Sequence, residues 1–176
     1  PLARPPRDVL RVRRAHCFDG AMLAAAALRR LGHPPLLCDL RAHDDDDHVL
    51  AVFRQGGGYG SIAKSNFVGL RYREPVYRSL RELAMSYFEP YYNLDGYRAL
   101  REYSVPLDLR RFDALDWQTS SLGVDAIERA LDSIRHFPLL TAAMLRTIGK
   151  IDERSYRAGM LGADLAGVYR PTGSAR

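Results

Sequence analysis

The segment of residues 18–31 constrains the fold of this chain more than any other part of the sequence. Its run of Ala, Leu and Met consists of good helix formers. The apolar side chains surround nearly the whole helix, which is typical of a helix buried inside a domain. Gly32 follows in the position where many helices end, and Arg29 and Arg30 occupy the last turn, where positive charge is favourable. We therefore expect the fold to be built around this helix.

Three extended segments follow the predicted helix. Residues 36–40 predict a short strand, and residues 48–54 predict a longer one. The glycines at 56–58 then turn the chain into residues 59–66, which we expect to pair with the second strand as a hairpin. An acidic loop, residues 41–47, separates the first two strands.

The second half of the sequence is predicted to be mostly helical. Apolar side chains recur at roughly helical spacing in several segments, namely residues 74–92, 124–136, 139–150 and 155–169. Residues 103–109 are expected to be extended, and residues 8–15 supply a short helical turn. The fold class is therefore α+β, with a small antiparallel sheet on the buried helix and a helical region over residues 74–170 covering the core. A chain of 176 residues suits one domain, residues 1–176.

Composition narrows the class of protein. Hydrophobic residues make up 47% of the chain and charged residues 27%, which is ordinary for a globular protein and excludes a disordered one. No stretch approaches the roughly 18 uninterrupted apolar residues of a membrane span. Residues 1–14 lack the apolar core of a signal peptide. Because the chain begins at Pro1 with no initiator methionine, we expect a trimmed N-terminus. Two cysteines are too few for a disulfide framework, which favours a reducing, cytoplasmic location.

The net charge of +5 comes almost entirely from arginine, because Lys64 and Lys150 are the only lysines among 26 basic residues. Such a balance permits weak attraction to nucleic acid or to anionic surfaces. An arginine-rich solvated surface from a GC-rich genome explains it better. We predict no specific nucleic acid partner and no membrane partner.

Candidate chemistry begins at Cys17, directly before the predicted helix. The free N–H groups and the positive end of the dipole at a helix N-terminus stabilise a thiolate. His48 begins the strongest strand, so its side chain can lie at the sheet end where the helix also starts and can act as the base. Cys38 lies in a leucine-rich strand, and we expect an inert buried thiol there.

The order of these pieces resembles the transglutaminase-like superfamily, which has a papain-like cysteine fold. The matching segments, about a third of the chain in all, are His16-Cys17-Phe18-Asp19-Gly20-Ala21, Asp47-His48-Val49-Leu50-Ala51-Val52 and Tyr59-Gly60-Ser61-Ile62. The resemblance implies a bacterial cysteine hydrolase or acyltransferase with its core at residues 16–67. In such an enzyme Cys17 attacks the carbonyl of a peptide, amide or ester substrate and His48 moves the proton, with no metal or organic cofactor.

The third member of the family's triad is usually an Asp, less often an Asn, on the strand after the His, where it fixes the imidazole. In this sequence the aligned stretch offers Ser61, and the nearest amide is Asn66. Either of them orients His48, or Asp47 or another loop carboxylate substitutes, or the triad is degraded. In the last case the chain is a non-catalytic binding or structural module of the same fold.

Three further residues are candidates for substrate binding: Lys64, His16 and Tyr59. Lys64 lies two residues from Asn66, where it either lines the cleft and binds a substrate carboxylate or is an exposed lysine at a strand end. His16 either adjusts Cys17 or faces water. The four aspartates at 44–47 lack the spacing and the glycine of a calcium loop, so we predict a solvated turn and no metal. Hydrolysis or transfer, and the oligomeric state, stay open.

Overall fold

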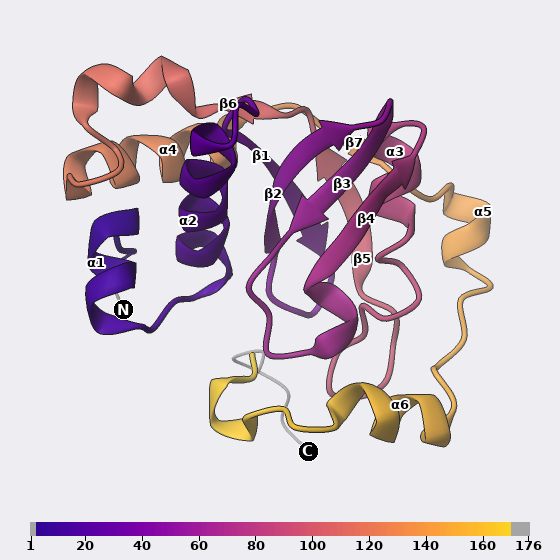
Figure 1. Ribbon diagram of the computed structural model, residues 1–176. Coiled ribbons are helices and arrows are strands. Elements are labelled where there is room, and N and C mark those ends of the chain that lie inside the picture. Colours follow the sequence, from indigo (N-terminus) through magenta and orange to yellow (C-terminus); the bar gives the residue numbers. More distant parts are fainter. Residues whose placement is uncertain (1–2, 170–176) are drawn as a thin grey trace.

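A computed structural model describes residues 3–169, and within this range the chain forms a mixed α/β fold around a seven-stranded antiparallel sheet (Figure 1). The strand order is β4-β3-β2-β1-β5-β7, and β6 pairs with β1 beside this path. The strands are β1 (Leu36–Ala42), β2 (His48–Gln55), β3 (Gly58–Ile62), β4 (Tyr72–Tyr77), β5 (Leu100–Ser104), β6 (Leu107–Asp108) and β7 (His136–Pro138). β2 therefore lies inside the sheet, between β1 and β3.

Helix α2 (Cys17–Arg30) packs on one face of the sheet, on the same side as α1 (Pro6–Val12) and α4 (Ser121–Ser133) (Figure 1). Its small side chains bring it close to β2, where Val49, Ala51 and Phe53 point toward it. Met22, at the centre of this contact, is fully buried. Burying such a side chain contributes about 1.5–3 kcal/mol to the stability of the fold. The contact between α2 and β2 therefore fixes the position of α2 on the sheet.

The opposite face carries the other half of the β2 side chains. Leu50 and Val52 pack with α3 (Leu80–Met85) and the tyrosines that follow it. Because side chains alternate along a strand, His48 shares the face of Leu50 and Val52. Its ring centroid lies 6.4 Å from that of Tyr87 and 6.2 Å from that of Tyr91.

The first half of the chain follows the sequence predictions. α2 begins at Cys17, and β1 and β2 cover the two predicted strands. α1 corresponds to the expected helical turn. β3 ends at Ile62, earlier than the predicted limit of the hairpin, so Lys64 and Asn66 lie in the loop after it.

The prediction of a mostly helical region over residues 74–170 is wrong. The range 74–92 begins inside the strand β4, and only α3 is helical within it. Pro75 accounts for the difference, because proline has no N–H and breaks a helix interior but is tolerated in an edge strand such as β4. Tyr72 and Tyr77 also favour a strand.

The rest of this half contributes strands as well as helices. The predicted helix of residues 124–136 ends at Ser133, and His136 lies in β7. Residues 139–150 hold only the short α5 (Ala142–Leu145). The segment of residues 103–109 is extended at both ends, in β5 and β6, as predicted.

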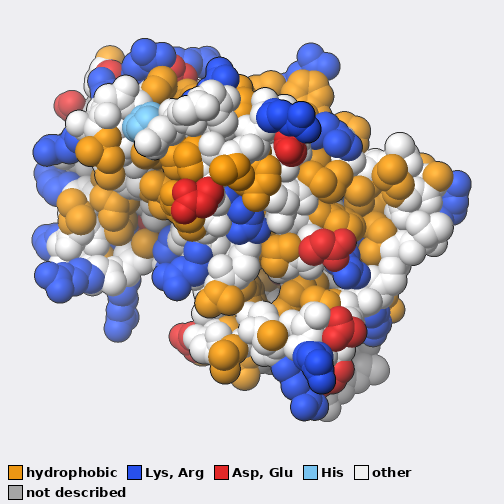
Figure 2. Space-filling model, turned by 45° about the vertical axis from the view of Figure 1, so that its right-hand side comes forward, with side chains coloured by type: hydrophobic (Ala, Val, Ile, Leu, Met, Phe, Trp, Pro, Cys, Tyr) orange, Lys and Arg blue, Asp and Glu red, His pale blue; other side chains and the backbone are white. Residues whose placement is uncertain are grey.

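The C-terminal part of the described chain lies apart from the sheet. It comprises α6 (Glu153–Met160) and the 3-10 helix η3 (Leu165–Gly167). In Figure 2 the lower lobe, which contains α6, is set off from the rest of that face by a hollow. Across residues 3–169, no helix combines the length and apolarity needed to cross a membrane.

Candidate active site

Cys17 is the first residue of α2, and its sulfur faces the backbone at the start of β2. The thiol donates to the carbonyl oxygen of Asp47 over 3.7 Å. Burial raises the pKa of the Cys17 thiol, and the charge of Asp46 raises it further, whereas the backbone N–H groups of Val49 and Phe18 lower it. At neutral pH the resting group is therefore a protonated thiol that has stabilising N–H donors within reach.

The start of α2 is fixed by Asp19. Its carboxylate accepts hydrogen bonds from the backbone N–H of His16 over 3.4 Å and of Arg4 over 2.9 Å, and the Arg4 guanidinium lies 3.8 Å away. The Asp19 side chain is almost completely buried. An acidic residue in the first helical turn is also favoured by the helix dipole. The N-terminal segment thus holds the position from which Cys17 projects.

His48 is buried, and its Nε2 lies 2.9 Å from the carbonyl oxygen of Leu70, in the 3-10 helix η1 (Val68–Leu70). A carbonyl oxygen only accepts, so Nε2 carries the proton and Nδ1 of the neutral ring has the free lone pair. Burial lowers the pKa of His48 to about 4, and the charges of Arg73 and Lys64 lower it as well, against the effect of the Leu70 carbonyl. The ring is therefore neutral at physiological pH and has one basic nitrogen.

Cys17 and His48 line the same pocket. Around them lie the acidic loop of residues 45–47, the loop of residues 64–67 and Tyr91. The Tyr91 hydroxyl donates to the Asp46 carbonyl and so ties the acidic loop to the rest of the pocket. Within residues 3–169 no hydrogen bond joins the thiol to the imidazole, since each bonds to a different backbone carbonyl.

The residues predicted to orient His48 have other partners. The Ser61 hydroxyl is buried and lies 2.8 Å from the hydroxyl of Tyr87. The Asn66 amide bonds to the backbone of Asp164. Asp47 accepts from the backbone N–H of Ala42 over 2.8 Å. The group on Nε2 of His48 is the Leu70 carbonyl rather than any of these side chains.

The three predicted substrate-binding residues divide between two places. Lys64 and His16 line the pocket, and both are exposed. Lys64 packs directly on α2, because a Cβ placed on Gly20 would lie 2.3 Å from the Lys64 Cβ. Tyr59 lies toward the hairpin turn instead, with the Arg54 guanidinium 4.8 Å from its ring centroid, and it is not part of the pocket.

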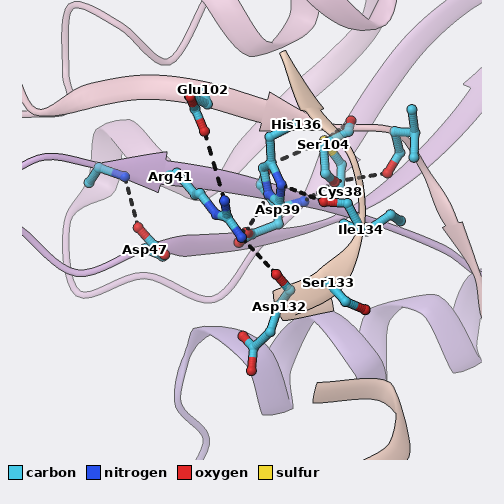
Figure 3. Close-up of polar contacts among 12 residues, drawn as sticks. Cys38, Asp39, Arg41, Asp47, Glu102, Ser104, Asp132, Ser133, Ile134 and His136 are labelled. Atoms are coloured by element: carbon cyan, nitrogen blue, oxygen red, sulfur yellow. Dashed lines mark hydrogen bonds and ion pairs between the residues drawn. The ribbon is translucent and has the colours of Figure 1, made fainter. Parts of the chain in front are cut away.

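A second polar cluster, which was not predicted from the sequence, lies between β1, β5 and β7 (Figure 3). His136 Nε2 is 2.9 Å from the Asp39 carboxylate, and His136 Nδ1 is 2.8 Å from the Ile134 carbonyl. The Ser104 hydroxyl accepts from the backbone N–H of Asp39. Arg41 reaches the Asp39 carboxylate from the other side, at 3.9 Å.

Both ring nitrogens of His136 face oxygen atoms, and each of these two contacts needs one proton to be a hydrogen bond. Either the imidazole is charged beside a carboxylate, or a neutral imidazole accepts from a protonated Asp39. Burial raises the pKa of Asp39, whereas its hydrogen bond to His136 lowers it. Neither side chain lines the pocket of Cys17.

Cys38, beside this cluster, behaves as a buried thiol. It is fully buried, its sulfur lies 3.5 Å from the Ser104 carbonyl, and burial raises its pKa to about 12. Within the described range no group of three or more His, Cys, Asp or Glu side chains is arranged to hold a metal ion. Asp45, Asp46 and Asp47 of the acidic loop line the pocket of Cys17.

Comparison with known proteins gives this chain no family: no protein-family model matches it, and no curated protein matches it.

Proposed function

We propose that this chain carries out thiol-dependent acyl chemistry, hydrolysis or transfer, on a peptide, amide or ester, with a core of the transglutaminase-like type. The observation that carries the proposal is the shared pocket of Cys17 and His48. One supplies a sulfur nucleophile at a helix N-terminus, and the other supplies a neutral ring with a free nitrogen. Nucleophile and base brought together from distant parts of the chain are what covalent catalysis requires.

The reaction would start from the uncharged Cys17 thiol and the neutral His48 imidazole. As the Cys17 sulfur attacks the substrate carbonyl, Nδ1 of His48 takes the thiol proton, and the carbonyl oxygen becomes an oxyanion beside the free N–H groups of the first turn of α2. The C–N or C–O bond then breaks, and His48 gives the proton to the leaving group. The resulting thioester is cleaved by water or by an amine, which restores the thiol.

The Leu70 carbonyl would hold the ring in the required tautomer throughout. Because this oxygen is neutral, it stabilises the transient imidazolium less than a carboxylate does. Arg73 and Lys64 also disfavour that cation. We therefore expect slow turnover compared with an enzyme that has a complete Cys-His-Asp triad.

The same observation favours a second candidate, a non-catalytic module that binds a ligand in the pocket. Its supporting feature is the neutral partner of His48, since a ring held by a backbone carbonyl can be kept for structure alone. The two candidates make different predictions about Cys17. Only the first requires that its reaction with an acyl donor depend on His48.

The test is acylation of the full chain by p-nitrophenyl acetate at neutral pH, followed by intact-protein mass spectrometry and peptide mapping. We expect one acetyl group on Cys17, none in Cys17→Ser, and an unchanged rate in the matched thiol control Cys38→Ser. His48→Ala should slow acylation at least about tenfold, because general-base assistance contributes at least that much. A rate equal to that of free cysteine and indifferent to His48→Ala leaves the binding module as the function.

A further inference from the structure

The chain returns to the Cys17 pocket at its C-terminal end. After α6 it turns at Gly162, whose φ of +74° is readily adopted only by glycine. Residues 164–169, which we call the C-terminal strap, then run to the pocket, and Gly167, Val168 and Tyr169 form part of its lining. The strap therefore lies beside the same space as Cys17 and His48.

One side chain of the pocket holds this strap. The Asn66 amide nitrogen donates to the carbonyl of Asp164 over 2.8 Å, and the Asp164 N–H donates to the Asn66 amide oxygen, also over 2.8 Å. The two residues are 98 positions apart in the sequence. Because both bonds go to the main chain of Asp164, they do not depend on the side chains of the strap.

The strap is attached to a fixed base but is itself weakly packed. Helix α6 is anchored by Tyr156, whose hydroxyl donates to the Leu94 carbonyl over 3.0 Å and whose ring lies against that of Tyr92. In the strap, by contrast, Leu165 is 60% exposed. Segments with few buried contacts open locally at low cost, so α6 can stay in place while the strap moves.

We propose that the C-terminal strap is an autoinhibitory cover of the Cys17 pocket, latched by the paired hydrogen bonds between Asn66 and Asp164. This inference rests on the proposed function. A substrate reaches Cys17 when the latch opens, and an extended polypeptide offers Asn66 the same N–H and C=O groups as Asp164. Asn66, predicted from the sequence to orient His48, is on this account the residue that holds the cover.

The latch is tested with variants of the full chain that weaken it from either side. Asn66→Ala removes both. Asp164→Pro removes the N–H donor at a residue whose φ of −81° suits proline. Asp164→Ala is the matched control, because it keeps the main-chain pair and loses only the side-chain cap on the Ala166 N–H. Hydrogen exchange of residues 163–169 reports latch opening directly.

Access to Cys17 is measured by alkylation with a polyethylene glycol maleimide and, separately, by acylation with p-nitrophenyl acetate. We expect Asn66→Ala and Asp164→Pro to speed both the exchange and the bulky alkylation about tenfold, and Asp164→Ala to change them less than about twofold. If hydrogen exchange is faster in these variants but alkylation of Cys17 is unchanged, the strap does not cover the pocket. If hydrogen exchange is also unchanged, the Asn66–Asp164 bonds do not latch the strap. If alkylation is faster but Cys17 is not acylated in any variant, the strap is a cover of the pocket and the proposed acyl chemistry is wrong.

Discussion

The charge on the acidic loop bears on the reactivity of a single atom, the sulfur of Cys17. The Asp46 carboxylate raises the pKa of this thiol. We expect Asp46→Asn to lower the pKa and to speed alkylation by iodoacetamide at pH 8 roughly two- to threefold, with a smaller gain at high salt, because salt screens exposed charges. The measurement is the pH dependence of the alkylation rate.

The neighbouring loop residue Asp44 provides the control. It is exposed, and its φ of +54° is one that asparagine tolerates well. Asp44→Asn should leave the alkylation rate of Cys17 unchanged. Equal acceleration in both variants would mean that the net charge of the loop, rather than the position of Asp46, controls the thiol.

The buried ring of His48 makes folding depend on pH. Its pKa is about 4 in the folded protein, against about 6.5 unfolded, so the unfolded chain binds more protons between these values. Stability contributed by the neutral ring is therefore complete above pH 6.5 and is lost as the pH falls toward 4. The loss amounts to about 3 kcal/mol between pH 7 and pH 4.

Urea unfolding of His48→Gln at pH 7 and pH 4 measures this contribution. The variant should lose about 3 kcal/mol less than the wild type over that interval, whatever its stability at pH 7. His43→Gln is the control, because His43 is exposed in the acidic loop. If His48→Gln retains the full pH dependence of the wild type, another buried group is responsible for it.

At the scale of secondary-structure elements, α2 and the loop after β3 meet at the contact between Gly20 and Lys64. Alanine at position 20 favours a helix by up to about 1 kcal/mol. Its Cβ would nevertheless lie 2.3 Å from the Lys64 Cβ. We expect Gly20→Ala to destabilise the protein by about 1–3 kcal/mol, the usual effect of overpacking.

A pair of second variants isolates that contact. Lys64→Gly removes the clashing Cβ and should restore most of the stability lost in Gly20→Ala. Lys64→Ala keeps the Cβ and should restore none. The test is the free energy of unfolding of the three single variants and of the two double variants that combine Gly20→Ala with a substitution at Lys64. Rescue by both substitutions would assign the effect to the Lys64 chain beyond Cβ instead.

How far the sequence predicts the structure differs between elements for physical reasons. The first half is predictable because its signals are local: helix formers in α2, alternating apolar residues in β2 and glycines in the hairpin. β4 was not predicted because Val76 continues the helical spacing of Leu80 and Leu83, whereas Pro75 excludes a helix there. The contact of His48 with the Leu70 carbonyl could not be predicted from the sequence, because the acceptor is a backbone oxygen placed by a loop and no side chain type indicates it.

At the scale of the whole molecule, the Asp39–His136 pair joins strands that are not neighbours. β1 and β7 lie on either side of β5, and the pair spans it. His136 is also anchored to the Ile134 carbonyl, where the chain leaves α4. The contact therefore ties the outer strand β7 and α4 to β1, the neighbour of the strand on which α2 packs, so its loss should affect the stability of the whole fold.

The variants of this pair should differ strongly in stability. His136→Ala leaves the Asp39 carboxylate buried without its partner, which costs about 3–5 kcal/mol. Asp39→Asn should cost less than about 1.5 kcal/mol, because the asparagine amide can donate to Nε2 of a neutral His136 while Nδ1–H still bonds to Ile134. Urea unfolding at pH 7 measures both values. A loss in Asp39→Asn as large as that in His136→Ala would mean that the negative charge itself holds the strands together.

The pH dependence of His136→Ala provides an independent measurement of the same contact. Without the imidazole, burial should raise the pKa of Asp39 further, so the folded variant binds a proton that the unfolded chain has released. Its stability should then rise relative to the wild type as the pH falls toward 4, because protonation removes the unpaired charge. Asp39→Asn has no such carboxyl and should show no recovery. A deficit in His136→Ala that is constant from pH 7 to pH 4 would assign the cost to lost packing around the ring.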